Sequence, residues 1–462
     1  MTSLLLKIDW AGGAVQAGQL LLALSILIIL HEFGHYITAR WFGCRVEKFF
    51  LFFDPWFALV KKKVGDTVYG IGWLPLGGYV KISGMIDESM DKEAMKQPPK
   101  PYEFRSKPAW QRLIIMLGGI IMNVLVAFII YAFVLMIWGE KKVPSDSLKY
   151  GIAVADSSVL YEIGLRSGDK IIAIDGEPAN DFEKILRRMI VSEDTWTIER
   201  NGQTLELKIP QNLIGKLIES KRNGRISLIE PRIPTIAKYM PDSSNAYKGG
   251  LRVGDRIVAI DSVKTDYFDE LRSQLERKKD KDVNVTVMRN GAPLQLTVHA
   301  DNNGLLGFIP YGKGDFTEMD SLGWVKLNVT KYGFFPAFPA GVRKTGEELV
   351  YYIEQFKKIL NPKTEGYKGL GGFKGIGSNF SKIWHWESFW TFTAFLSIIL
   401  AFMNLLPIPA LDGGHVMFTL YEMISGRKPN EKFLEYAQIV GMILLLGLML
   451  YANGNDWFGW GR

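Results

Sequence analysis

This 462-residue chain has only one cysteine and lacks long runs of basic residues. Its one cysteine, Cys44, excludes an intramolecular disulfide and a zinc site built from CxxC pairs. No run of Lys or Arg exceeds three residues and the net charge is only +7, so the composition does not favour nucleic acid binding. A metal site in this chain therefore has to use its 5 histidines and its carboxylates.

Charge is also missing from three long apolar segments, residues 113–138, 389–408 and 436–453. Each is long enough to cross a hydrocarbon core of about 30 Å. A fourth apolar run, residues 20–30, reaches membrane length only if its helix continues through His31, Glu32 and His35. No small-residue cleavage site follows this run, so we interpret it as a retained helix and not as a secretory signal peptide. The sequence therefore predicts a membrane protein with four spans.

Basic residues beside these spans indicate their orientation. Residues 43–107 carry 11 Lys and Arg, whereas the first 16 residues carry only Lys7. Cytoplasmic loops of membrane proteins are enriched in Lys and Arg. We therefore predict that residues 43–107 are cytoplasmic and that both termini and residues 140–385 lie on the opposite face.

An internal repeat occupies the middle of the chain. GLRSGDKIIAIDG from Gly164 and GLRVGDRIVAIDS from Gly250 agree at 9 of 13 positions, and each copy leads to a helical pattern and a strand that ends in Arg-Asn-Gly. This predicts two similar β-rich domains. The string resembles the PDZ domains of periplasmic proteases, in which we expect its Gly, Leu and Ile residues to serve as core and turn, with peptide capture at an edge strand.

Two segments follow the repeats. Leu349, Ile353, Phe356 and Leu360 share one helical face, which predicts an amphipathic helix on the membrane surface or against a PDZ domain. The glycine-rich residues 369–377 lack the Lys-Ser/Thr pair of a phosphate loop, so we interpret them as a hinge or linker.

His31-Glu32-Phe33-Gly34-His35 fits the HExxH pattern. Histidines at i and i+4 lie on one face of a helix, where one zinc ion can bind both imidazoles, and the intervening Glu projects beside the metal. Ionisable groups at the end of an apolar helix are costly to insert and are tolerated mainly where function needs them. A helix end that snorkels to the membrane surface is the alternative interpretation.

A catalytic zinc site needs a third protein ligand and an open position for water. The predicted topology places His299 and His385 on the wrong side of the membrane. Asp412 and His415, which follow the third span, and Cys44 remain as candidates.

The motif at 31–35, the string Asn404-Leu-Leu-Pro407-Ile-Pro-Ala-Leu-Asp412-Gly-Gly-His415 and the tandem repeats between them together resemble the site-two protease family of intramembrane metalloproteases. The resemblance implies that His31, His35 and Asp412 bind zinc and that Glu32 is the general base. It also implies that Asn404 and Pro407 shape the site and hold the substrate strand.

Two further segments contribute to the resemblance. Residues 118–123, GGIIMN, are similar to a second-span motif of the family, and their small residues permit close helix approach. Residues 73–79 resemble the edge strand of a β-hairpin that presents substrate, so the resemblance implies substrate contacts at Trp73, Leu74, Pro75, Leu76, Gly77, Gly78 and Tyr79. The chain departs from the usual family pattern at residues 371–377 and 49–56.

The expected fold is a polytopic α-helical membrane protein with about four transmembrane helices, a membrane-associated β-hairpin and two periplasmic β-rich PDZ domains. The predicted segments are a first transmembrane helix with HExxH (1–42), a cytoplasmic membrane-associated β-hairpin and loop (43–108), a second transmembrane helix (109–139), two PDZ domains (140–228 and 229–310), an amphipathic helix and linker (311–387), a third transmembrane helix with the LDG motif (388–412), a cytoplasmic loop (413–434), and a fourth transmembrane helix with the C-terminus (435–462).

The expected function is zinc-dependent cleavage of single-pass membrane proteins near the cytoplasmic side of a bacterial inner membrane. The resemblance implies an anti-sigma factor, already trimmed on its periplasmic side, as substrate in an extracytoplasmic stress response, with remnant signal peptides as a second class. Membrane lipid is the other expected partner. The alternatives are a non-catalytic membrane scaffold with two PDZ domains and a metal transporter. The intact motif residues argue against the scaffold, and a single ligand cluster argues against the transporter.

Overall fold

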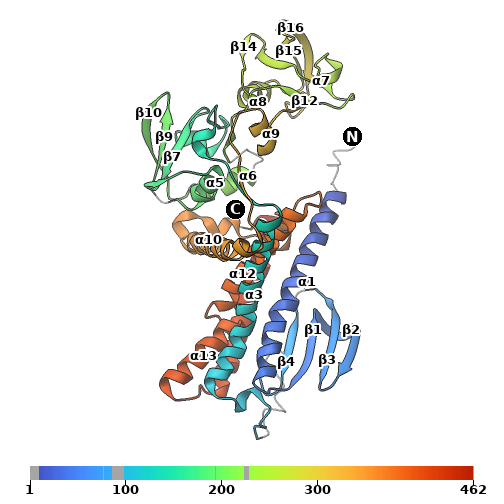
Figure 1. Ribbon diagram of the computed structural model, residues 1–462, viewed down its shortest axis with the longest axis vertical. Coiled ribbons are helices and arrows are strands. Elements are labelled where there is room, and N and C mark those ends of the chain that lie inside the picture. The colour runs from blue at the N-terminus through green and yellow to red at the C-terminus, as the bar shows by residue number, and fades with distance from the viewer. Residues whose placement is uncertain (1–9, 76, 86–97, 193, 223–227, 461–462) are drawn as a thin grey trace. The chain divides into compact units, whose positions relative to one another are not determined.

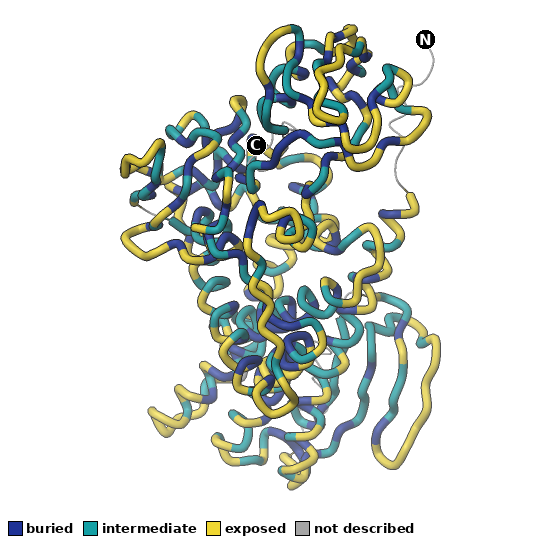
Figure 2. The backbone as a smooth tube through the Cα atoms, turned by 45° about the horizontal axis from the view of Figure 1, so that its top comes forward, coloured by how far each residue is buried: buried dark blue, intermediate teal, exposed yellow. Residues whose placement is uncertain are grey.

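The computed structural model describes residues 10–75, 77–85, 98–192, 194–222 and 228–460. The chain forms two compact units. The membrane unit comprises residues 1–139, 331–353 and 370–461, and the repeat unit comprises residues 140–330 and 354–369. Each unit has its own buried interior, drawn in dark blue in Figure 2.

Four helices of the membrane unit are long and apolar enough to cross a membrane, in agreement with the four predicted spans. They are α1 (Trp10–Trp41), α3 (Ala109–Ile137), α12 (Trp386–Leu405) and α14 (Glu431–Phe458). The helix α1 continues through the HExxH motif, which confirms the prediction that the first apolar run reaches membrane length in this way. In Figure 1, α1, α3 and α12 lie side by side.

Glycines allow α1 and α3 to approach closely. A Cβ added at Gly34 would lie 2.2 Å from the carbonyl oxygen of Gly118, and a Cβ at Gly118 would lie 2.6 Å from the carbonyl oxygen of Gly34. Ala23 and Leu27 of α1 pack with Leu396 of α12 in the apolar core between the helices. The small residues predicted to permit close approach therefore do so, and they bring the backbone of α3 next to the HExxH motif.

A four-stranded sheet follows α1, which corrects the predicted hairpin. Its strands are β1 (Val46–Leu51), β2 (Phe53–Val64), β3 (Thr67–Leu74) and β4 (Tyr79–Ile82), in the order β2-β3-β1-β4. The antiparallel pair β2–β3 is the predicted hairpin, but β1 pairs in parallel with β3 on its other side. Trp73 and Leu74 are consequently on an interior strand, and the edge strand beside α1 is β4.

The third span ends where prolines interrupt it. The helix α12 stops at Leu405, residues 406–411 form a turn, and a new helix, α13 (Asp412–Ser425), begins at Asp412. Pro407 and Pro409 lack the amide proton that a continuous helix needs. Asp412 is therefore the first residue of α13 and not part of the third span, and much of the predicted cytoplasmic loop 413–434 is helical.

The predicted amphipathic helix is α10 (Phe334–Leu360). Within the membrane unit it packs across α3 and α12: a Cβ at Gly341 would meet the backbone of Ala132, and the ring of Tyr352 contacts Phe402. The glycine-rich linker contains the short helix α11 (Phe373–Gly377), whose Gly372 and Gly375 amides donate hydrogen bonds to Asp456 of α14.

The repeat unit contains two four-stranded sheets with the same plan. The first has the order β10-β9-β7-β8 and the second β14-β13-β15-β16, which is the same order read from the other end. Their elements are β7 (Lys170–Ile174), β8 (Glu177–Pro178), α5 (Phe182–Val191), β9 (Thr195–Arg200) and β10 (Gln203–Lys208), then β13 (Arg256–Ile260), β14 (Val263–Lys264), α8 (Phe268–Glu276), β15 (Lys281–Arg289) and β16 (Ala292–Ala300).

Short elements complete the repeat unit. Two-stranded pairs join β5 (Glu140–Lys142) to β18 (Asn328–Thr330), β6 (Ile152–Ala153) to β11 (Glu230–Pro231) and β12 (Ala237–Tyr239) to β17 (Ile309–Pro310). The helices are α4 (Val159–Glu162), α6 (Leu213–Arg222), α7 (Asn245–Lys248) and α9 (Phe316–Ser321). Met319 and Trp324, after the second repeat, pack into the core of the first.

The two motifs of each repeat meet in one ion pair. Asp255, in the Gly-Asp of the second copy, binds both Nε and Nη2 of Arg289, the arginine of its Arg-Asn-Gly, at 2.8 and 2.7 Å. Asp169 and Arg200 make the same two bonds in the first copy, at 2.7 Å each. Both aspartates are at most 1% exposed. The Gly-Asp and Arg-Asn-Gly motifs therefore form the same buried bidentate pair in both copies, although they are 31 residues apart in the first and 34 in the second.

Candidate metal centre and active site

Three side chains converge at the last third of α1. The Nε2 atoms of His31 and His35 are 3.3 Å apart, and Oδ2 of Asp412 lies 3.3 Å from each of them. Among the described residues, these three form the cluster of ligand atoms close enough to hold one metal ion. The HExxH spacing supplies two ligands on one helical face, and the helix start at Asp412 supplies the third.

This triangle has the dimensions of one face of a tetrahedral zinc site. Ligands about 2.0–2.1 Å from a zinc ion at tetrahedral angles are about 3.3–3.4 Å apart. Oδ2 of Asp412 is also a buried atom without a hydrogen-bond donor, a situation that costs about 1–3 kcal/mol unless another group satisfies it. A divalent cation would satisfy it, so the residues fit zinc.

Hydrogen bonds orient both imidazoles for this role. Nδ1 of His35 lies 2.9 Å from the backbone carbonyl oxygen of Ile115, so it carries the proton and leaves Nε2 with its lone pair. Nδ1 of His31 lies 3.1 Å from the Asn123 side-chain amide. Oδ1 of Asn123 is buried without a partner. Turning this amide by 180° would satisfy both groups, because Oδ1 would then accept the His31 Nδ1 proton.

Gly119 makes room for the two rings. A Cβ at this position would lie 2.3 Å from Nε2 of His35 and 2.6 Å from Cε1 of His31. The metal centre therefore depends on α3 at Gly119 and Asn123, two contributions that the motif spacing did not identify as functional. Residues 118–123 were interpreted as packing residues, and nothing in their local sequence indicates which groups they face.

Glu32 lies beside the cluster in a cavity of about 720 Å³. The cavity is lined by His31, His35 and Asp412 and by the residues of the edge strand β4. The Glu32 carboxylate faces the backbone amide of Val80 in β4. A carboxylate held next to an open position of a zinc site is the arrangement that general-base activation of water requires.

The rival third ligands do not join the cluster. His415 lines the cavity one helical turn after Asp412, but it is not among the three converging residues. Cys44 is 2% exposed and packs with Ala39 and Val46. Burial raises the pKa of the Cys44 thiol, which disfavours the thiolate that would bind a metal.

Only some of the residues predicted to contact substrate line the cavity with the metal ligands. Leu74, Gly78 and Tyr79 line the cavity with the metal cluster. Trp73 instead donates its indole N–H to the Pro55 carbonyl oxygen. The residues of the predicted set that are not among those lining this cavity are Trp73, Pro75, Gly77, Asn404 and Pro407, and Leu76 lies outside the described residues.

A polar group on the sheet also faces the cavity. The Tyr79 hydroxyl donates to Oδ1 of Asp54 at 2.7 Å, and Nζ of Lys48 donates to the Tyr79 oxygen at 3.2 Å. All three residues line the cavity. Lys48 and Asp54 lie in strands whose sequence pattern gave no sign of a role in the site.

These features define what the arrangement can do. Bound zinc would polarise a carbonyl group and lower the pKa of a bound water towards 7. Glu32 is placed to take a proton, the two histidines and Asp412 to hold the ion, and β4 to offer backbone hydrogen bonds to an extended peptide.

Comparison with known proteins gives the same assignment. The sequence profile of peptidase family M50 matches residues 19–448. The regulator of sigma-E protease RseP of Escherichia coli is 27% identical over 456 residues, covering 94% of this chain and 97% of the relative. A putative zinc metalloprotease of Vibrio cholerae is 29% identical over 455 residues, with the same coverage. The RseP protein of Salmonella typhimurium is 26% identical over 458 residues, again with the same coverage.

The matched span includes the HExxH helix, the repeats and the residues around Asp412, which confirms the resemblance inferred from the motifs. Four helices in the described part of the chain are long and apolar enough to cross a membrane. The chain belongs to peptidase family M50, the site-two protease family, and is a zinc metalloprotease.

Proposed function

We propose that this protein cuts single-pass membrane proteins within the membrane, close to its cytoplasmic face, and releases a cytosolic fragment. The observation that carries the proposal is the triangle of ligand atoms, 3.3 Å on each side, next to Glu32 within an apolar helix that is long enough to cross a membrane. An anti-sigma factor already trimmed on its periplasmic side is the proposed substrate, because relatives of similar length are named regulators of sigma-E protease. Remnant signal peptides form a second class.

In this proposal His31, His35 and Asp412 hold the zinc, and Glu32 removes a proton from the attacking water and delivers it to the leaving amide nitrogen. Asn404 and Pro407 are proposed to shape the turn that follows α12, since neither lines the cavity. Their contribution would then be to position Asp412, three residues after Pro409.

The substrate has to unwind before it can be cut, because the peptide bonds of a transmembrane helix are already hydrogen-bonded. We propose that the unwound segment pairs with β4, whose first residues Tyr79 and Val80 lie at the cavity beside Glu32. The edge position of β4 in the sheet supports this proposal. Gly78, just before β4, keeps this end of the strand close to Glu32, because a Cβ there would lie 2.6 Å from Cγ2 of Ile28 and 3.5 Å from Cγ of Glu32.

The two repeats are proposed to be PDZ domains on the periplasmic face of a bacterial inner membrane. The shared strand order of their sheets and the low Lys and Arg content of the flank before α1 support this assignment. On that face they would exclude substrates that keep a bulky periplasmic domain. Exclusion needs only bulk, whereas capture of a carboxyl terminus costs ordering entropy.

The test is cleavage of paired substrates, one full-length and one trimmed on its periplasmic side. Replacing residues 151–301 by a flexible linker should allow cleavage of the full-length substrate and change the rate on the trimmed one by less than about tenfold, or about 1.4 kcal/mol. A deletion protein that stays in the membrane but still refuses the full-length substrate, or loses activity on the trimmed one, would contradict the filter role. Zinc-independent cleavage would contradict the proposed chemistry.

A further inference from the structure

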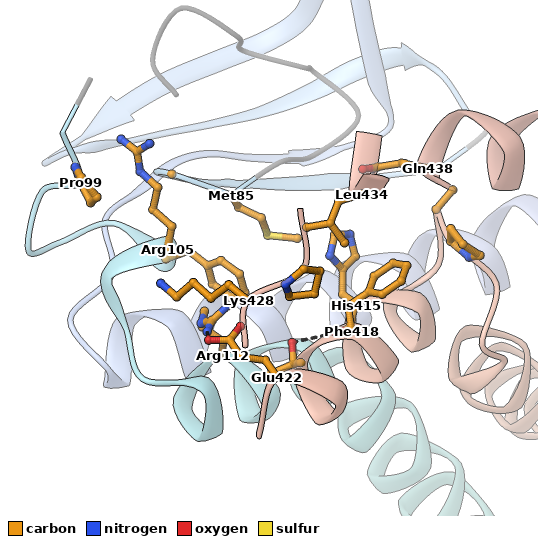
Figure 3. Close-up of a pocket in the computed structure, with 16 residues that line it drawn as sticks. Met85, Pro99, Arg105, Arg112, His415, Phe418, Glu422, Lys428, Leu434 and Gln438 are labelled. Carbon is orange, nitrogen blue, oxygen red and sulfur yellow. Dashed lines mark hydrogen bonds and ion pairs between the residues drawn. The ribbon is translucent and has the colours of Figure 1, made fainter. Parts of the chain in front are cut away.

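A second cavity, of about 410 Å³, opens next to the catalytic one in the membrane unit. The two cavities share four lining residues, Met85, Ala410, His415 and Gln438. Figure 3 shows that its charged side chains gather at one end, whereas His415, Phe418 and Leu434 lie at the other, with Met85 between them. The charged end is therefore the end away from the zinc cluster.

The turn that ends the edge strand lies between the two cavities. Tyr79, Val80 and Ile82 of β4 line the catalytic cavity. After Ser83, the chain turns at Gly84, whose φ is +71°, and Gly84 and Met85 line the second cavity. A strand advances about 3.3 Å per residue. Because β4 itself ends at Ile82, a substrate strand that pairs with β4, is cut beside Val80 and stays extended past this turn would place residues roughly three to five positions from the scissile bond in the second cavity.

The charged end of this cavity carries a positive excess. Three of its described lining residues are cations, Arg105, Arg112 and Lys428, and one is an anion, Glu422. Arg112 pairs with Glu422 at 2.6 Å, and Arg105 pairs at 2.6 Å with Glu103, just outside the lining. The ammonium group of Lys428 adds the remaining positive charge. Phe104 and Phe418 provide apolar walls.

We propose that this second cavity is a substrate subsite that accepts an acidic side chain three to five residues from the scissile bond and disfavours a basic one. The inference rests on the proposed cleavage at the zinc cluster. In this proposal Lys428 determines the specificity of the subsite, and the ion pair of Arg112 and Glu422 forms part of its wall.

Such a subsite would discriminate among membrane proteins. The cytoplasmic flanks of most transmembrane helices are rich in Lys and Arg. A cationic cavity at this point would repel those basic flanks, so most membrane proteins would be poor substrates. The few that carry an acidic residue at this position would be favoured. The selection would act on sequence and would be independent of the size of the periplasmic domain.

The experiment uses the full chain in vesicles and a single-pass substrate whose cut site has been mapped by mass spectrometry. Glu or Lys is placed singly at each position three to five residues from the cut, on either side. At one or more of these positions the wild-type protein should cut the Glu substrate about fivefold faster than the Lys substrate. Lys428→Glu should lower this ratio at least about threefold. Arg427→Glu, the neighbouring residue outside the cavity lining, is the matched control and should keep the wild-type ratio.

Equal cleavage rates of the Glu and Lys substrates at every position would overturn the inference, and so would equal effects of Lys428→Glu and Arg427→Glu. In both cases the substrates would still be cut, so the proposed function would stand. Absence of cleavage of the whole series by the wild-type protein would overturn the proposed function and this inference together. The assay is repeated in phosphatidylcholine vesicles with and without phosphatidylglycerol. A Lys428 effect that depends on phosphatidylglycerol and not on substrate charge would assign the cavity to a lipid headgroup and overturn the peptide subsite.

Discussion

Gly119 of α3 lies directly against the two candidate zinc ligands of α1. Its missing side chain leaves the space into which Nε2 of His35 and Cε1 of His31 project. Both atoms belong to rings that are oriented by Asn123 and by the Ile115 carbonyl group, so they have little freedom to move away. A single methyl group should therefore displace a metal ligand.

The first prediction follows from this contact. Gly119→Ala should lower zinc content and reduce cleavage at least about 100-fold, although alanine favours a helix by about 1 kcal/mol over glycine. Gly18→Ala in α1 is the matched control, because a Cβ there meets nothing within 4 Å. Zinc quantification on both purified variants checks the prediction, and wild-type zinc content in Gly119→Ala would contradict it.

The second prediction concerns Asn123. Asn123→Leu removes the acceptor for the His31 Nδ1 proton and should weaken zinc binding about 10–100-fold, the usual cost of losing such a partner. Asn123→Asp keeps an acceptor and should retain zinc better than the leucine variant. Competition with a chelator of known affinity measures the difference. Equal affinity in the two variants would show that this amide does not orient His31.

The two histidine ligands of this site could be predicted from the sequence, whereas the residues of α3 that support them could not. Two histidines four residues apart lie on one helical face whatever the tertiary fold, so His31 and His35 could be paired from spacing alone. Asp412 was one of three candidates until the family resemblance selected it. Asn123 and Gly119 act across a helix–helix contact, and no local pattern specifies which residue of a neighbouring helix stands opposite an imidazole.

At the scale of elements, the absence of charge predicted three of the spans, because burial in lipid disfavours charge along a helix. The first span was predicted from a shorter apolar run that reaches membrane length only by continuing through the HExxH motif. The sheet order β2-β3-β1-β4 was not predicted, since the parallel contact of β1 with β3 joins strands that are not neighbours in the chain. The helix α13 was predicted as part of a cytoplasmic loop, because at 14 residues it is too short to cross a membrane. The 5-residue helix α11 lies in the glycine-rich segment that was predicted to be a hinge or linker.

The third prediction tests the ion pair that joins the two motifs of the second repeat. Burial alone would raise the pKa of Asp255, but the Arg289 guanidinium and the Arg252 backbone N–H lower it below its usual value. Asp255→Asn should therefore reduce the stability of this domain by about 1.5–3 kcal/mol at pH 7, the range for hydrogen bonds to charged groups. Protection of the β13 and β15 amides from hydrogen exchange measures it in the full chain.

The pH dependence of this effect has a defined sign. A lowered carboxyl pKa stabilises the folded state above the unfolded value of about 3.9, and the stabilisation is lost as the pH falls through the lower folded value. The difference between wild type and Asp255→Asn should be largest near neutral pH and should shrink below about pH 4. Asp242→Asn, at an exposed loop position, is the control. A difference that stays constant with pH would contradict the ion-pair explanation.

At the scale of the whole molecule, the positive-inside pattern predicts that the two ends of the chain and the repeat unit face the periplasm. Residues 43–107 and the segment after α13 should face the cytoplasm. The native Cys44 is 2% exposed and gives little background for thiol labelling. Intact cells treated with an impermeant maleimide should label Lys279→Cys in the repeat unit and leave Arg427→Cys unlabelled. Labelling of Arg427→Cys alone would show that the orientation is inverted.

The central claim is that Glu32 acts as a base beside a zinc ion held by His31, His35 and Asp412. The most direct measurement is zinc content and cleavage rate of Glu32→Gln in the same preparation, with Asp412→Ala beside it. The account predicts that Glu32→Gln keeps about one zinc per chain and loses cleavage, because the amide preserves size but cannot accept the proton, whereas Asp412→Ala loses both. Cleavage by Glu32→Gln at a rate near that of the wild type would contradict the account.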